Sequence, residues 1–183
     1  MLSYLQCCLY YIYTVLPYLN CPSCYTKYMI SHEPKDYICP FCDWLAGNET
    51  EYKQNSDIVY QDEYVTAFIS PKWWVNNPGN IIVIPNQHYE NLYDIPEDAL
   101  SHVYITIKKL AVAMRDSYPH CTGTSTRQHN EPDGNQDVWH FHAHLFARYP
   151  NDDLYIQHEN KRFVEPSERK VYADLLKKTL SKA

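Results

Sequence analysis

The feature that most restricts the fold of this chain is a short segment in which histidines alternate with apolar residues, Trp139-His140-Phe141-His142-Ala143-His144-Leu145-Phe146. Successive side chains of a β-strand point to opposite faces, so the spacing predicts a strand with His140, His142 and His144 on one face. The apolar residues between them then point to the other face, towards a core. Each imidazole has a donor and an acceptor to satisfy, so three in a row do not form apolar core. The row therefore indicates a chemical site on one face of a sheet.

Patterns elsewhere in the chain predict an α+β domain built around this strand. Apolar and β-branched runs predict strands at 57–61, 64–70, 81–84, 122–128 and 138–148, with a Pro- and Asn-rich loop at 71–80. Apolar spacing and Pro or Gly punctuation predict a short helix at 41–46, a long helix between Pro96 and Pro119, and a C-terminal helix at about 166–180. With only one long helix between neighbouring strands, the order favours a mainly antiparallel α+β sheet over a doubly wound one.

Charge and glycine content exclude several classes of protein. The 183 residues contain 16 Lys and Arg against 22 Asp and Glu, a formal charge of −6, and no run of basic residues. Binding to a nucleic-acid duplex needs clustered positive charge, so we expect no such partner. The chain has only 4 glycines and neither of the common Gly-rich phosphate-binding motifs. Enzymes that depend on those loops are therefore excluded.

Residues 1–28 differ from the rest of the chain. They hold four of the 7 cysteines and seven of the 18 tyrosines, but a single charge, Lys27. The segment has no basic start and no small-residue cleavage site, so it does not match a secretory signal. We expect a leader outside the fold, with Met29 as a possible true start and 29–183 as one domain without a membrane partner. A membrane anchor and a zinc-binding segment are the two alternatives.

The histidine row suits two kinds of chemistry. Imidazole is a common ligand of Zn²⁺ and other transition metals. Imidazole also acts as a nucleophile towards phosphorus, while neighbouring groups stabilise the developing charge. A non-catalytic nucleotide- or metal-binding module, in which the row only ligates, is a third reading. The residues alone leave these hypotheses open.

The chain resembles the histidine triad (HIT) superfamily of nucleotide hydrolases and transferases. The row from His140 to Phe146 is similar to the superfamily signature, and three further blocks match in order, Asn130–Gln136, Gly79–His88 and Cys39–Gly47. The resemblance therefore covers about residues 37–150, with the motifs at 39–150. It implies a five-stranded, mainly antiparallel sheet with one long helix and a C-terminal helix, and a homodimer.

The resemblance also implies roles for individual residues. His142 is expected to attack the α-phosphate of a nucleotide and form a covalent nucleotidyl-histidine, which water then hydrolyses. His144 is expected to hold phosphate oxygens or assist the leaving group, and Asn130 and Gln136 to donate amide hydrogens to the phosphoryl group. The expected enzyme is a hydrolase of nucleotide phosphoanhydrides or phosphoramidates, similar to dinucleoside polyphosphate hydrolases. A nucleotidyltransferase with the same intermediate is the alternative.

Three positions depart from the superfamily pattern. Ser70 occupies the place of the usual ribose-binding Asp, so Ser70 is the candidate for that contact. Asn80 stands where a His usually follows Gly79. Asp137 replaces the Ser or Thr that many relatives carry, and places an extra negative charge near the phosphates.

A metal site is expected at Cys39-Pro-Phe-Cys42, whose spacing is typical of metal ligands. By spacing alone, the other ligands could be Cys21 and Cys24, or the two thiols could be small core residues. The resemblance to bacterial relatives implies instead a closed structural zinc site made of Cys39, Cys42, His88 and His140. Reduced, metal-binding thiols are typical of a cytoplasmic protein.

Overall fold

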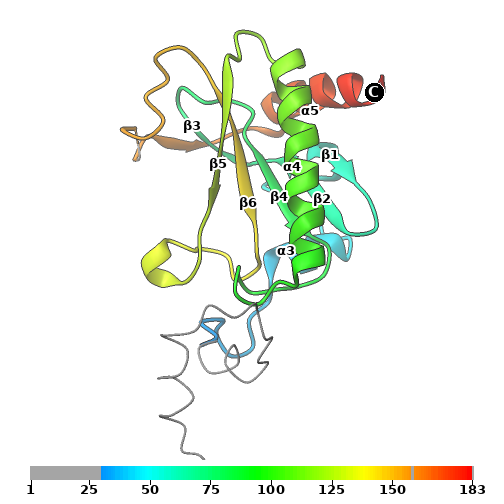
Figure 1. Ribbon diagram of the computed structural model, residues 1–183, viewed down its shortest axis with the longest axis vertical. Helices are drawn as coiled ribbons and strands as arrows, with labels where there is room; N and C mark the ends of the chain where they lie inside the picture. The colour runs from blue at the N-terminus through cyan, green and yellow to red at the C-terminus, as the bar shows by residue number, and fades with distance from the viewer. Residues whose placement is uncertain (1–29, 158, 183) are drawn as a thin grey trace, which may run out of the picture. The chain divides into compact units, whose positions relative to one another are not determined.

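The computed structural model describes residues 30–157 and 159–182. The expectations for residues 1–28, including the alternative zinc ligands Cys21 and Cys24, lie outside these ranges. Within the described residues, the main sheet has the strand order β1-β2-β4-β6-β5, and each neighbouring pair is antiparallel (Figure 1). Its strands are β1 (Ile58–Gln61), β2 (Val65–Ile69), β4 (Ile81–Pro85), β5 (Gly123–Gln128) and β6 (Ala143–Arg148). The predicted antiparallel α+β fold is confirmed.

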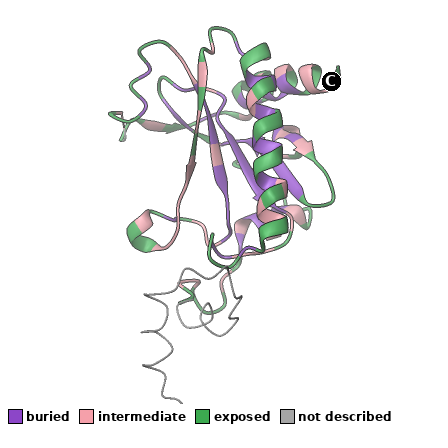
Figure 2. Ribbon diagram, viewed as in Figure 1, coloured by how far each residue is buried: buried purple, intermediate pink, exposed green. Residues whose placement is uncertain are grey.

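The long helix and the C-terminal helix cover one face of this sheet. Helix α4 (Glu97–Ser117) has acidic residues in its first turn, where their charge interacts favourably with the helix dipole. Its apolar stripe from Val103 to Met114 is buried. Helix α5 (Pro166–Leu180) contributes Ala173 and Leu176 to the same core. In Figure 1, α4 runs along the sheet, and in Figure 2 the strands behind it are mostly buried.

The opposite face of the sheet carries the histidines. Along β6, Ala143 and Leu145 belong to the core under α4, whereas His144 is aligned with Ile82 of β4. Ile82 belongs to a second cluster, which packs against helix α3 (Pro40–Leu45). The short helix therefore covers the histidine face, and the two faces have separate cores.

The strand that carries the histidine row begins further along the chain than the sequence predicts. Strand β6 begins at Ala143, because the preceding backbone bonds outside the ladder: the Phe141 N–H donates to Tyr89 O at 2.6 Å and the His140 N–H to Val138 O at 2.9 Å. The predicted strand at 138–148 is thus wrong over its first residues. The alternation continues nevertheless, since Phe141 is in the α4 core while the ring of His142 packs against Phe41 of α3.

The predicted loop at 71–80 contains a strand. Within it, β3 (Lys72–Trp74) pairs with β7 (Lys161–Phe163) in a separate antiparallel ribbon. The short one-turn helices η1 (Asn55–Asp57) and η2 (Pro132–Gly134) complete the described elements. Strands β3 and β7 have only 3 residues each, too few for a local periodicity, so the pairing of distant segments defines the ribbon.

Candidate active site and metal site

His142 is buried at the start of β6, with one ring nitrogen held by the backbone. Its Nδ1–H donates to the carbonyl oxygen of His140 at 2.8 Å, so the lone pair lies on Nε2. Burial lowers the pKa of His142, although the His140 carbonyl and the Asp137 carboxylate act in the opposite direction. The ring is therefore neutral at pH 7, with a nucleophilic nitrogen facing away from the backbone.

His144 lies next to His142 on the same face. The two ring centroids are 5.2 Å apart, and the planes are inclined by 79°. Burial, followed by the charges of neighbouring groups, lowers the pKa of His144 well below its usual value. Its Nδ1 is buried and has no hydrogen-bond partner among the described residues. The described chain thus leaves this polar atom available to a group from outside.

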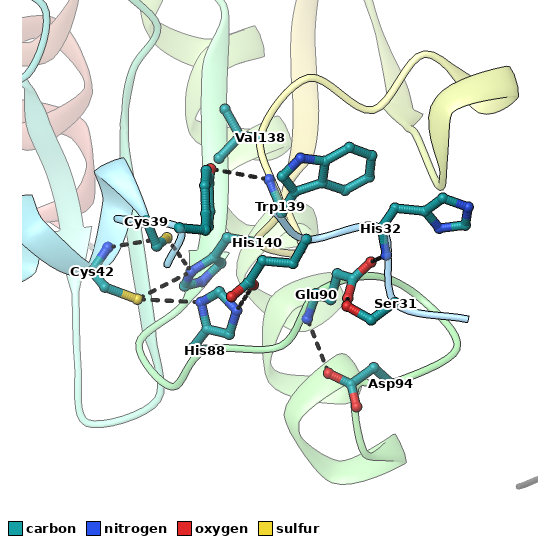
Figure 3. Close-up of polar contacts among 12 residues, drawn as sticks. Ser31, His32, Cys39, Cys42, His88, Glu90, Asp94, Val138, Trp139 and His140 are labelled. Atoms are coloured by element: carbon teal, nitrogen blue, oxygen red, sulfur yellow. Dashed lines mark hydrogen bonds and ion pairs between the residues drawn. The ribbon is translucent and has the colours of Figure 1, made fainter. Parts of the chain in front are cut away.

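The His140 ring faces the thiols of Cys39 and Cys42, whereas the rings of His142 and His144 do not. Its Nδ1 is 3.4 Å from Cys39 Sγ and 3.5 Å from Cys42 Sγ, while its Nε2–H donates to Pro85 O at 3.0 Å. His88 Nδ1 is 3.4 Å from Cys42 Sγ. Figure 3 shows both rings converging on the thiols. The four ligand atoms lie within 4.8 Å of one another.

This donor set fits a tetrahedral zinc ion. With sulfur ligands at about 2.3 Å and nitrogen ligands at about 2.0–2.1 Å, such a site separates sulfur from nitrogen by about 3.6 Å. The observed separations of 3.4–3.5 Å are close to this value. Burial lowers the pKa of His140 to about 4, which keeps the ring in the neutral form that binds metals. The set is a closed Cys₂His₂ arrangement with no position for substrate.

A carboxylate that the sequence did not single out supports one of these ligands. Glu33 Oε2 is 2.9 Å from His88 Nε2, so the carboxylate fixes His88 with Nδ1 facing the thiols. The preceding residues are held as well, since Glu90 accepts hydrogen bonds from the Ser31 hydroxyl at 2.5 Å and the His32 N–H at 2.7 Å (Figure 3). No sequence signal links Glu33 to His88, because the two lie 55 positions apart.

The structure gives Gln136 a different role from the expected phosphate contact. Its Nε2 donates to Glu90 O at 2.6 Å and Val138 O at 3.0 Å, and its Oε1 accepts from the Glu131 N–H at 2.9 Å. Both amide hydrogens are therefore used within the protein. Glu131 has φ 61°, a conformation that costs energy for a non-glycine residue. Gln136 fixes this strained loop beside the histidines.

Asn130 is held by its neighbours but keeps one amide hydrogen. Its Oδ1 accepts from the Leu92 N–H and from Gln128 Nε2, both at 2.8 Å, and its Nδ2 donates to Gln128 Oε1 at 2.8 Å. The second hydrogen on Nδ2 has no hydrogen-bond acceptor among the described residues. The Asn130 side chain is therefore fixed in position, and one N–H of its Nδ2 can still donate to a ligand.

Ser70 is buried directly after β2, on the histidine face. Its N–H donates to Asn80 O at 2.8 Å, which continues the β2–β4 register beyond Ile69 and Ile81. The Ser70 hydroxyl donates to Lys72 O at 3.0 Å and accepts from the Lys72 N–H at 3.3 Å. In this arrangement the hydroxyl closes a turn into β3, and the structure does not bring it to His142.

Asp137 lies beside Nε2 of the buried His142 ring. Its Oδ1 is 3.8 Å from His142 Nε2, and its side chain is 87% exposed. A phosphoryl group bound at His142 would therefore lie next to a carboxylate.

None of the residues described here forms a helix long and apolar enough to cross a membrane.

Comparisons with known proteins agree on one family. The family model described as HIT domain matches residues 51–151. The Bacillus subtilis protein named Protein hit is 32% identical over 115 residues, which cover 63% of this chain and 74% of the relative. The purine nucleoside phosphoramidase of Escherichia coli K12 is 35% identical over 103 residues, covering 52% and 78%. The fold matches a crystal structure described as a Zn-bound histidine triad family protein from Mycobacterium smegmatis, with a TM-score of 0.64, 24% identity, and coverage of 79% and 94%.

Proposed function

The chain belongs to the HIT domain family, and from this premise we propose that it hydrolyses a nucleotide phosphoanhydride or phosphoramidate through a covalent nucleotidyl-His142. One observation carries the proposal: His142 donates through Nδ1 to the His140 carbonyl at 2.8 Å, which leaves the Nε2 lone pair free to attack. The phosphoramidase activity named for the Escherichia coli relative supports the same class of bond.

The proposed reaction has two displacement steps at the same phosphorus atom. First, His142 Nε2 bonds to the α-phosphorus while the bond from that phosphorus to the leaving oxygen or nitrogen breaks. Water then attacks the phosphorus, the P–N bond to His142 breaks, and the products are a nucleoside monophosphate and free imidazole. We assign phosphate contacts to His144 and to the remaining amide hydrogen of Asn130, while Gln136 and Ser70 hold the surrounding backbone.

Covalent labelling tests this proposal directly. The protein is incubated with adenosine 5′-phosphoramidate or diadenosine tetraphosphate, quenched in alkaline denaturant because the P–N bond to histidine is labile in acid, and analysed by intact mass without acidification. We expect an added adenylyl group on the wild type and on His120→Asn, whose histidine is exposed and distant in the fold. His142→Asn should carry no adduct and should lose activity by about 10³-fold or more. The proposal fails if the wild type is as unlabelled and inactive as His142→Asn on both substrates.

We further propose a structural zinc ion at Cys39, Cys42, His88 and His140. The ligand separations and the neutral form of His140 support it, and a bound ion would fix α3 to the start of β6. Elemental analysis should find one zinc per chain in the wild type and in Cys21→Ser/Cys24→Ser. Cys39→Ser/Cys42→Ser should lose the metal. Loss of zinc from the first double variant would contradict this ligand set. Reduced thiol ligands also lead us to place the protein in the cytoplasm.

A homodimer completes the proposal. Strand β5 is an edge of the main sheet, and its residues Thr124 and Thr126 are exposed on the side that carries α4. Tyr104 of α4 is 43% exposed. A second copy can pair with this edge and cover these side chains. Sedimentation should show a dimer that Tyr104→Glu weakens. Val112→Glu, on the flank of α4 next to α5, should leave the dimer intact. A monomeric wild type would refute this part.

A further inference from the structure

Two cations lie beside the histidine row, and neither belongs to the sites described above. Arg127 in β5 is paired in register with His144 in β6, so both side chains share the histidine face. Lys161, the first residue of β7, places its Nζ 4.4 Å from the centroid of the Trp74 ring. The Arg127 guanidinium carbon is 5.4 Å from the same ring. Trp74 therefore holds both cations together, and we call them the Arg127–Lys161 pair.

Within the described residues, no acid forms an ion pair with either cation. By contrast, Arg148 pairs with Asp152 at 2.7 Å and Arg162 with Glu168 at 2.7 Å. Burial and the charges of Lys72 and Arg127 lower the pKa of Lys161, and Asp137 only partly offsets them. The Asp137 side chain is largely exposed, so solvent screens its charge. The region beside His144 thus carries excess positive charge.

Buried polar atoms without partners gather near the same place. His144 Nδ1, Trp74 Nε1 and the Asn80 amide have no hydrogen-bond partner among the described residues. The rings of His144 and Trp74 contact Phe146, with centroid separations of 5.7 Å and 5.0 Å. Asn80 continues the register in which Ile81 faces Leu145, so it is level with Phe146. Buried polar groups are nearly always paired, so this cluster indicates a partner that the described chain does not supply.

Aromatic packing alone does not account for the cations. The Arg127 guanidinium lies 5.1–5.6 Å from the rings of Trp74, Phe146 and Tyr155, and these contacts fix its direction. They leave its charge uncompensated, and a second cation on the same Trp74 adds repulsion. A neutral side chain would pack there without this cost. The arrangement therefore favours an anionic ligand.

We propose that the Arg127–Lys161 pair is an anion subsite that holds the phosphate of the leaving group; this inference rests on the proposed hydrolysis at His142. When His142 Nε2 bonds to the α-phosphorus, the bond to the bridging oxygen breaks. That oxygen keeps the electron pair, and the departing phosphate gains negative charge. Cations next to His144 stabilise this charge as it develops. An amine leaving group takes up a proton and gains nothing from them. The subsite thus selects phosphoanhydrides such as dinucleoside polyphosphates over phosphoramidates.

Substitutions at the subsite should separate the two substrate classes. Arg127→Gln and Lys161→Gln remove one charge each, and Arg162→Gln is the matched control, because Arg162 lies next to Lys161 but pairs with Glu168. For diadenosine tetraphosphate, kcat/KM should fall about tenfold to hundredfold in each subsite variant, as expected for a lost charge-assisted hydrogen bond. For adenosine 5′-phosphoramidate it should change by less than about threefold, and the control should match the wild type on both.

Binding of inorganic pyrophosphate to the resting protein gives a readout without turnover. Calorimetry should show weaker binding in Arg127→Gln/Lys161→Gln than in the wild type or Arg162→Gln, by about tenfold or more. Equal losses on both substrates, or unchanged pyrophosphate affinity in the double variant, would overturn the subsite. A wild type that forms no adduct and cleaves neither substrate refutes the hydrolase. In that case the pyrophosphate titration still decides whether the pair binds anions.

Discussion

At the residue scale, one alternating pattern contains two unlike sites. The rings of His140 and His142 follow each other on one face, yet the first converges on two thiols and the second presents Nε2 beside Asp137. The resemblance to the superfamily predicts a metal at His140 and catalysis at His142; the structure brings the His140 ring to the thiols, and the two roles stay predictions. The contact of Glu33 with His88 and the hydrogen bond from Gln136 to Glu90 O were not predictable, since each joins segments far apart in the sequence.

Glu33 should strengthen metal binding through His88. The Glu33→Gln variant keeps a hydrogen-bond acceptor near His88 Nε2 but removes the charge that makes the imidazole more basic. Zinc affinity, measured by competition with a chromophoric chelator, should fall about tenfold, at the low end for lost supporting contacts. Glu49→Gln, at an exposed carboxylate near α3, serves as the control. Equal affinities for the two variants would mean that Glu33 only anchors the backbone.

Asp137 should reduce the affinity of the site for phosphates. Its carboxylate is 3.8 Å from His142 Nε2, where a bound phosphoryl group carries negative charge. In Asp137→Asn this repulsion disappears, so kcat/KM for diadenosine tetraphosphate should rise about threefold to fivefold at low salt and less at high salt. Asp133→Asn, in the same loop, should have no effect. A fall in activity would identify Asp137 as a proton carrier instead.

At the scale of elements, the sequence predicted best those helices whose ends are marked by a nearby proline. Pro96, Pro119 and Pro166 mark helix ends, and α4 and α5 begin directly after or at such residues. The β3–β7 ribbon was missed, because its short strands are defined by pairing between segments about 90 positions apart rather than by local propensity. The start of β6 was misplaced for a similar reason, since Tyr89 takes the Phe141 N–H out of the ladder.

Helix α5 should depend on one buried ion pair. Arg169 is 1% exposed, and its guanidinium donates to Asp57 Oδ1 at 3.0 Å and to the carbonyl oxygens of Val164 and Glu51. Arg169→Met leaves the Asp57 carboxylate buried and unpaired, so the free energy of unfolding in urea should fall by about 3–5 kcal/mol. Adding Asp57→Asn should recover part of this loss. A double variant less stable than Arg169→Met would contradict the account.

At the scale of the whole molecule, charge is distributed unevenly. The chain has a formal charge of −6, yet the region beside His144 carries Arg127 and Lys161, which form no ion pair with the part of the chain that the structure describes. Sequence charge alone pointed away from polyanions of the duplex type and gave no sign of this local reversal. Cross-strand pairing produces it, because β5 and β7 bring together residues that are far apart in the sequence.

Acid stability should depend partly on Asp152. The Arg148 guanidinium, aided by the Tyr149 and Leu154 N–H groups and Asn77, holds the pKa of Asp152 well below its usual value. A lowered folded-state pKa stabilises the protein above the unfolded value of about 3.9, and this stability is lost as the pH falls below it. Asp152→Asn should therefore cost about 1–3 kcal/mol of unfolding free energy at pH 7. The difference in unfolding free energy between wild type and Asp152→Asn should become smaller below about pH 4, as measured by denaturant unfolding at matched metal content. A difference independent of pH would exclude the ionised carboxylate as its source.

His140 has a consequence for how its two neighbourhoods communicate. Its ring lies among the four candidate metal ligands, while its carbonyl oxygen accepts the hydrogen that sets the tautomer of His142. An ion that fixes the ring also fixes the peptide group, so metal binding and nucleotide binding become thermodynamically linked. Any factor by which zinc raises the affinity for a nucleoside monophosphate must equal the factor by which the nucleotide raises the affinity for zinc, measured by equilibrium competition with a chelator. A metal ion bound at His140 would then adjust the affinity for nucleotide at His142 as well as stabilise the fold.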